Sequence, residues 1–158
     1  KDIFENIEFR KSKTINMNNR NFTYSFESSQ TPEAIFDLLL HIDQWWSGQY
    51  GETIEGESSK VNDEFTFRAG GGMHYTRQKM TELIPNKRVA WQVSESNLTF
   101  LTDTTEWLNT HISFDIATEN NQTKVTFTHT GLVPTLECYN NCSQGWTKYL
   151  DALKKKLS

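Results

Sequence analysis

The chain of 158 residues is long enough for one domain with a sizeable hydrophobic core and too short for two ordinary domains. Only 35% of the residues are hydrophobic, but 13% are aromatic, and these large side chains supply the apolar area that a disordered chain lacks. A net charge of −4 without a long basic run argues against nucleic acid as a partner. No stretch approaches the ~18 to 20 apolar residues that insert into a membrane, so we expect a soluble, cytoplasmic protein.

The first 29 residues divide into two parts. Residues 1–20 are polar and show little periodicity, so we interpret them as an N-terminal arm outside a single domain of residues 21–158. From Asn21 to Ser29, aromatic residues alternate with small or charged ones, as they do in half-buried strands. This segment is the predicted first strand.

A helix opening follows the first strand. Thr31 supplies a hydroxyl N-cap, Pro32 fits the first helical position, and a broad apolar face comes next. The face runs into Trp45 and Trp46, so we predict two short helices closed by this tryptophan pair. The pair either packs in the core, which we favour, or forms a hinge or lid edge.

From Thr53 onward the sequence changes to the period-two pattern of strands. Turn residues separate six runs, which predicts an antiparallel meander. The runs are residues 53–56, 64–68, 73–84, 88–95, 107–118 and 123–132. Residues 69–72 (AGGG) are predicted to form a plain hairpin turn, because a phosphate-binding glycine loop would be followed by a helix.

The register of the last hairpin follows from its turn. If Asn120 and Asn121 form a two-residue turn, three cross-strand pairs fall on one face. These pairs are Ile116 with Val125, Phe114 with Phe127, and Ile112 with His129. The face is apolar except at His129, so we predict that one imidazole points inward, toward the C-terminal helix.

The longest helical period lies at the end of the chain, from Leu136 to Leu157. One apolar stripe recurs there at three- and four-residue steps. The stripe consists of Cys138, Cys142, Trp146, Tyr149, Leu150, Leu153 and Leu157. A helix with one such stripe must lie on another layer, so we predict that it crosses the sheet, with Gly145 permitting a close approach.

Cys138 and Cys142 are four residues apart on this helix, so both thiols lie on one face. Intrahelical geometry disfavours a disulfide, and a zinc site would need more ligands nearby. We therefore predict two reduced, buried thiols and no metal.

Several short motifs resemble those of a known family. They run in order from Pro32–Glu33, through Trp45–Trp46 and Thr81–Val89 (TELIPNKRV), to Gly145–Trp146. Their order and spacing are similar to the Hsp90-ATPase-activator-like branch of the START/Bet v 1-like superfamily. The resemblance covers about residues 22–157.

The resemblance implies an α+β helix-grip fold. In this fold a curved antiparallel sheet wraps around a long C-terminal helix, with two short helices after the first strand, and encloses a cavity for apolar ligands. Two segments depart from the family pattern: Asn62–Asp63 stands where many members have a glycine, and the loop Asn97–Glu106 is longer than expected. We expect both departures to reshape the cavity mouth.

The leading functional hypothesis is a non-catalytic binding module for a small hydrophobic or amphipathic molecule held between sheet and helix. The polar handles of its aromatic interior would be the imidazole of His129 and the hydroxyl of Tyr149. The predicted ligand-binding residues are Trp45, Trp46, Phe65, Phe67, Trp91, Ile112, Phe114, Phe127, His129, Cys142, Trp146 and Tyr149. The alternative for His129 is a buried side chain bonded to a neighbouring carbonyl or hydroxyl. No cofactor is expected, and a weak homodimer is compatible with this hypothesis.

Two other functional classes stay open. An enzyme of the cyclase or hydrolase type would use the same cavity, but the sequence has no nucleophile elbow, zinc-protease motif or dinucleotide-binding glycines, and His129 has no identified partner. The resemblance also implies a chaperone (Hsp90-like) cofactor. The eukaryotic activator, however, has a separate large N-terminal domain for chaperone binding, so we favour the binding module.

Overall fold

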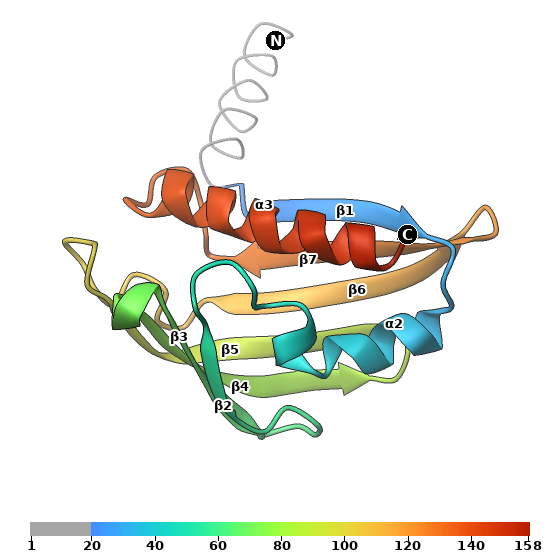
Figure 1. The fold of residues 1–158 in the computed structure, drawn as a ribbon, viewed down its shortest axis with the longest axis horizontal. Helices are drawn as coiled ribbons and strands as arrows, with labels where there is room; N and C mark the ends of the chain where they lie inside the picture. Colours follow the sequence, from blue (N-terminus) through green and yellow to red (C-terminus); the bar gives the residue numbers. More distant parts are fainter. Residues whose placement is uncertain (1–19) are drawn as a thin grey trace, which may run out of the picture.

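The computed structural model describes residues 20–158, which form one antiparallel sheet of seven strands with helices packed on it (Figure 1). The strands are β1 (Phe22–Ser28), β2 (Thr53–Gly56), β3 (Glu64–Ala69), β4 (His74–Ile84), β5 (Arg88–Leu98), β6 (His111–Glu119) and β7 (Gln122–Thr130). The helices are α2 (Pro32–Leu39) and α3 (Tyr139–Lys156), and the short 3-10 helices are η1 (Ile42–Gln44) and η2 (Gly70–Gly72).

The strand order in the sheet is β1-β7-β6-β5-β4-β3-β2. The first strand therefore pairs with the last, and the strands from β2 to β7 form the predicted meander. Figure 1 shows a curved sheet with the long helix α3 running along β1. The shorter helix α2 contacts β6. This arrangement confirms the predicted α+β helix-grip fold.

The last hairpin has the predicted register. Asn120 and Asn121 adopt φ angles of 51° and 64°, the left-handed values that a type I′ turn requires. The three predicted pairs are all observed: Ile116 with Val125, Phe114 with Phe127, and Ile112 with His129. Strand parity thus sends the His129 side chain to the inner face, as expected.

Two of the element boundaries that differ from the sequence prediction bear on the site. β6 begins at His111 rather than at Trp107, because the Thr110 N–H donates to the Trp107 carbonyl in a turn before the strand. α3 begins at Tyr139 rather than at Leu136, because a turn also precedes it, in which the Tyr139 N–H donates to the Leu136 carbonyl. The first difference places Trp107 in the lining of the site described below.

Aromatic rings fill much of the space between the sheet and α3. Trp45 and Trp46 are 3% and 2% exposed, and their rings stack with centroids 5.7 Å apart. Trp146 of α3 lies against both, with centroid distances of 6.4 and 4.9 Å. The tryptophan pair therefore packs in the core, as we favoured, and α3 is docked on it.

The proposed N-terminal arm, apart from Arg20, lies outside the described residues, so the division into arm and domain stays a prediction. Across residues 20–158, no helix combines the length and apolar character that a membrane span requires. In the same range no three His, Cys, Asp or Glu side chains gather as metal ligands would.

Candidate ligand-binding site

A pocket of about 360 Å³ opens between the first half of α3, the η2 turn and two loops. The loops contribute residues near 46–50 and 100–107. Seven of the sixteen residues that line the pocket have Trp, Tyr or Phe side chains: Trp46, Tyr50, Phe67, Phe100, Trp107, Trp146 and Tyr149. Ligand pockets commonly have volumes of about 300 to 1,000 Å³, so this one has room for a small molecule only.

The structure divides the twelve predicted ligand-binding residues into two groups. Those that line the pocket are Trp46, Phe67, Cys142, Trp146 and Tyr149. Those that lie in the packed core, each at most 3% exposed, are Trp45, Phe65, Trp91, Ile112, Phe114, Phe127 and His129. Strand parity assigned the six strand residues of the second group to the inner face, but the tryptophan pair, which includes Trp45, and α3 fill the space in front of them. Contact with a ligand stays a prediction for every one of the twelve.

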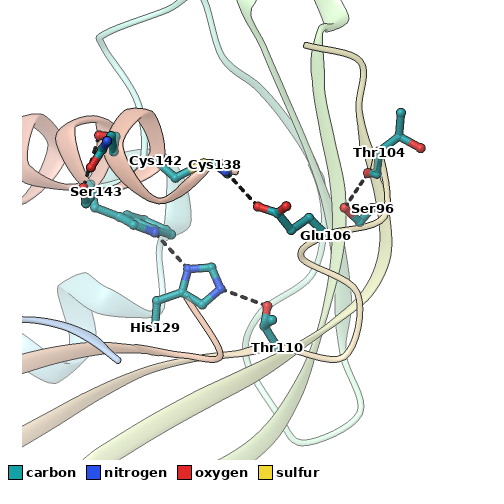
Figure 2. Close-up of a disulfide and its surroundings, with 10 residues drawn as sticks. Ser96, Thr104, Glu106, Thr110, His129, Cys138, Cys142 and Ser143 are labelled. Atoms are coloured by element: carbon teal, nitrogen blue, oxygen red, sulfur yellow. Dashed lines mark hydrogen bonds between the residues drawn. A yellow bond between two sulfur atoms is a disulfide. The ribbon is translucent and has the colours of Figure 1, made fainter. Parts of the chain in front are cut away.

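His129 is fully buried, and both of its ring nitrogens are hydrogen-bonded. Trp146 Nε1 donates to Nδ1 at 3.0 Å, so Nε2 carries the proton and donates to Thr110 Oγ1 at 2.8 Å (Figure 2). The Thr110 hydroxyl donates in turn to the Trp107 carbonyl at 2.6 Å. Burial lowers the pKa of His129 to about 3. His129 is therefore a neutral structural link, as the alternative interpretation has it, and does not line the pocket.

Two other residues bring polar ring atoms to the pocket wall. Nε2 of His74 and Nε1 of Trp107 are buried and have no hydrogen-bond partner within residues 20–158. The two rings meet edge to face with centroids 4.8 Å apart. Burial lowers the pKa of His74 to about 4, so this imidazole is neutral at pH 7. Both groups can therefore form uncharged hydrogen bonds with a ligand.

The sequence analysis missed both of these residues. The sequence contained a signal for His74. Arg77 and Lys79 are expected to face solvent, so the alternation of side chains along β4 puts His74 on the inner face together with Thr76. In the structure Thr76 is fully buried. Trp107 carried no such signal, because only the turn before β6 directs it to the pocket.

The Tyr149 hydroxyl is already bonded to a carboxylate at the pocket rim. It donates to Glu52 Oε2 at 2.7 Å, and the same oxygen accepts from the N–H groups of Gln49 and Tyr50 at 3.1 and 3.0 Å. Burial acts to raise the pKa of Glu52, but these hydrogen bonds outweigh it and lower the pKa. Burial, and then the bond to Glu52, raise the pKa of Tyr149. The pair fastens loop 49–52 to α3.

The loop that is long in this sequence forms another side of the pocket. Glu106 Oε1 accepts from the Cys138 N–H at 2.9 Å, and the Glu137 carboxylate accepts from the Thr102 N–H at 3.2 Å. Figure 2 shows the Glu106 side chain reaching the start of α3. These two carboxylates tie the loop to the helix and hold Trp107 in the pocket wall.

Cys138 and Cys142 are joined by a disulfide, so the prediction of reduced thiols is wrong (Figure 2). Cys138 is the residue that caps the start of α3, and the two Cα atoms are 5.4 Å apart. Disulfides span Cα distances of about 4.4 to 6.8 Å. The prediction held that intrahelical geometry disfavours a disulfide, yet the bond spans the first turn of α3, where Cys138 has α-helical φ and ψ and the Cys142 N–H donates to its carbonyl at 2.7 Å.

Gly145 does not mediate a close approach of helix and sheet, contrary to the prediction. A methyl group in place of its hydrogen would meet no heavy atom within 4 Å, and the residue lines the pocket. The missing side chain therefore adds room to the pocket.

Comparison with known proteins decides the family. The model of the family described as Activator of Hsp90 ATPase homolog 1-like protein matches residues 29–158. The chain belongs to this family. No curated protein sequence matches it.

Solved structures agree with this family assignment. The Aha1 dimer from Colwellia psychrerythraea is 31% identical, with a TM-score of 0.67 over 87% of this chain and 95% of that one. An HSP90 activator from Plasmodium falciparum is 18% identical, with a TM-score of 0.56 over 87% and 95% of the two chains. Protein MLL2253 from Mesorhizobium loti is 19% identical, with a TM-score of 0.65 over 86% and 95%. The last two similarities concern the fold alone.

Asn62, at one of the two expected departures from the family pattern, adopts a φ of 77°. Asparagine is one of the few residues other than glycine that enter this region readily. The turn before β3 therefore accommodates this residue, and Asn62 does not line the pocket.

Proposed function

We propose that this protein binds a small, mainly apolar molecule in the pocket between α3, η2 and the two loops, without catalysing a reaction. The observation that carries the proposal is the composition of the wall: its lining includes seven aromatic side chains, and two lining residues have buried ring nitrogens without a partner within residues 20–158. Binding sites for small molecules typically combine a largely apolar lining with a few polar groups.

Several contacts support binding over catalysis. His129 has both nitrogens engaged and lies behind the wall, and the Tyr149 hydroxyl is bonded to Glu52. A general base must reach the proton that it removes, and a nucleophile needs such a base beside it. In the described residues around the pocket, His74 is the one imidazole, and its pKa of about 4 makes it a weak base.

Native mass spectrometry of freshly purified protein tests the proposal first, because it detects a co-purified small molecule. A panel of fatty acids, sterols and polycyclic aromatic compounds is then titrated while tryptophan fluorescence is followed. Gly145→Leu should abolish saturable binding because its side chain extends into the pocket, whereas Gly145→Ala should bind nearly as the native protein does. If no compound binds, or if Gly145→Leu binds as well as the native chain, this pocket is not the site.

A second candidate function comes from the family. The structure at 31% identity is named Aha1, and another relative is named an HSP90 activator. We therefore also propose a contact with an Hsp90-type chaperone. Purified Hsp90 should bind this protein in a pull-down and hydrolyse ATP faster in its presence. An unchanged ATPase rate at saturating concentration would exclude the activator role for this chain.

A weak homodimer is the third part of the proposal. Its support is that the relative at 31% identity is described as a dimer. Light scattering coupled to size exclusion should show an apparent mass that rises with protein concentration. A constant mass of about one chain would exclude it.

A further inference from the structure

The inference below rests on the proposed binding function and concerns the chemistry of the ligand. The pocket wall contains one buried N–H group that no described residue satisfies, Nε1 of Trp107. An indole nitrogen can only donate. Three other core tryptophans have acceptors: Trp45 Nε1 donates to the Leu39 carbonyl at 2.9 Å, Trp91 Nε1 to Ser58 Oγ at 3.0 Å and Trp146 Nε1 to His129 Nδ1 at 3.0 Å. The buried donor of Trp107 lacks an acceptor within residues 20–158, in a side chain that lines the pocket.

His74 restricts the charge of the group that meets this donor. Its Nε2 also lacks a partner within residues 20–158, and its ring meets the Trp107 ring edge to face with centroids 4.8 Å apart, so the two unpartnered nitrogens belong to neighbouring rings of the pocket lining. The imidazole is neutral at pH 7 because burial lowers its pKa to about 4. The cation of the pocket lining, Lys148, is exposed and lies against the Tyr50 ring at 5.3 Å. A carboxylate beside His74 would therefore lose its hydration without gaining a counter-charge from the neutral imidazole, which is unfavourable. The site therefore fits an uncharged acceptor.

The surrounding wall restricts the body of the ligand. Trp46 and Phe67 stack with centroids 4.0 Å apart, and Trp107 and Trp146 stack at 5.8 Å with an angle of 12° between their planes. Each ring covers a face of its partner, and the four side chains are 1 to 3% exposed, so the pocket meets the flat apolar walls that these pairs form only at their uncovered surfaces. Flat rings pack on such surfaces in offset-stacked or edge-to-face contacts.

We propose that the ligand is an uncharged ring compound with a carbonyl group, and that the carbonyl oxygen accepts from Trp107 Nε1 with the ring body between the flat walls. His74 completes the site: its Nε2 donates to the same carbonyl in the tautomer with the proton on that nitrogen. The apolar rim, where Tyr50, Met73 and Phe100 are 42%, 51% and 37% exposed, admits such a ring from water or from another hydrophobic surface.

Matched probes test the proposal: acetylnaphthalene, and isopropenylnaphthalene substituted at the same ring position. The two have nearly the same shape, but only the first has a carbonyl oxygen. We expect the ketone to bind about fivefold to tenfold more tightly, the factor that one uncharged hydrogen bond provides. Trp107→Phe keeps a ring in the wall but removes this donor, so it should reduce the preference for the ketone to what the His74 hydrogen bond alone provides. Naphthoate, which is charged, should bind more weakly than the ketone.

NMR of the indole N–H groups gives a readout that needs no variant. The Trp107 signal should shift downfield with the ketone and not with the alkene, while the signal of Trp146, whose N–H is already bonded to His129, should stay in place. Equal affinities in the native protein, or an unmoved Trp107 signal at saturation, would overturn the inference while leaving ligand binding intact. If neither probe nor any compound of the panel binds, the proposed function fails as well.

Discussion

Trp146 is the side chain on which most of the interior converges. It is 2% exposed, its ring lies against those of Trp46 and Phe127 at 4.9 and 4.6 Å, and its Nε1 donates to His129. Trp146→Ala should lower the free energy of unfolding by about 3 to 5 kcal/mol, since it empties a large buried aromatic site. Urea denaturation measures the change.

Trp146→Phe is the matched variant for this site. It keeps a ring but leaves Nδ1 of His129 without a donor, so we expect a smaller loss, about 1 to 3 kcal/mol. If Trp146→Ala costs less than about 1 kcal/mol, which is usual for surface positions, then α3 is not docked through this residue.

His129 should make the stability of the protein depend on pH. Burial, and then the charges of His74 and His111, lower its pKa to about 3, whereas an imidazole in the unfolded chain has a pKa of about 6.5. The unfolded state therefore binds a proton that the folded state does not. The contribution of neutral His129 to the free energy of unfolding is fully present above pH ~6.5. It is lost as the pH falls toward 3, by about 1.4 kcal/mol per pH unit.

Urea unfolding between pH 7 and pH 5 isolates this effect, because carboxylates titrate mostly below that range. His74, with its pKa lowered to about 4, contributes in the same direction. The variant His129→Gln should be less stable at pH 7. Its free energy of unfolding should fall less steeply as the pH is lowered, because its unfolding takes up one proton fewer. An unchanged slope in this variant would mean that His129 is protonated in the folded state.

At the scale of elements, Gly145 shows how the pocket weakens the helix that forms it. A glycine in a helix interior costs about 0.5 to 1 kcal/mol relative to alanine. A methyl group at this position meets nothing within 4 Å. Gly145→Ala should therefore raise the free energy of unfolding by about 0.5 to 1 kcal/mol, as measured by thermal or urea denaturation.

Gly131 is the matched control for this prediction. It has a φ of 100°, and an added Cβ would lie 2.7 Å from Thr110 Cγ2, next to the hydroxyl that holds His129. Gly131→Ala should therefore be destabilising. If Gly145→Ala also destabilises the protein, the pocket beside α3 is smaller than the structure has it.

At the scale of the whole molecule, the disulfide should contribute little to stability. Cys138 and Cys142 are separated by four positions, so the closed loop constrains few conformations of the unfolded chain. In the chain-entropy model, closing a loop of this length raises the free energy of unfolding by about 2 kcal/mol at most. The reduced protein should therefore stay folded with a modestly lower melting temperature.

Thiol titration of the unfolded, non-reduced protein checks the bond itself and should find no free thiol. Two free groups would restore the interpretation made from the sequence. The result also bears on location, because disulfides persist in oxidising compartments and are rare in the cytoplasm, where we expected this protein.

The sequence by itself determined the elements and their order. Period-two runs predicted the meander, a proline and a threonine marked the start of α2, and the Asn120–Asn121 turn gave the register of the last hairpin to the residue. These features depend on backbone preferences and on local alternation, which act over a few residues. For the same reason the inward direction of His129 was predictable.

Only the tertiary structure decided where the interior stays open. The alternation along a strand predicts which face of the sheet a side chain lies on, but not which other side chains fill the space next to it. It therefore could not distinguish Phe114, which lies in the packed core, from Phe67, which lies in the pocket wall. That outcome depends on the volumes of side chains from distant segments: the tryptophan pair fills one end, and Gly145 leaves room at the other. The placement of Trp107 likewise depends on carboxylates that tie its loop to α3, a contact between segments that no local pattern encodes.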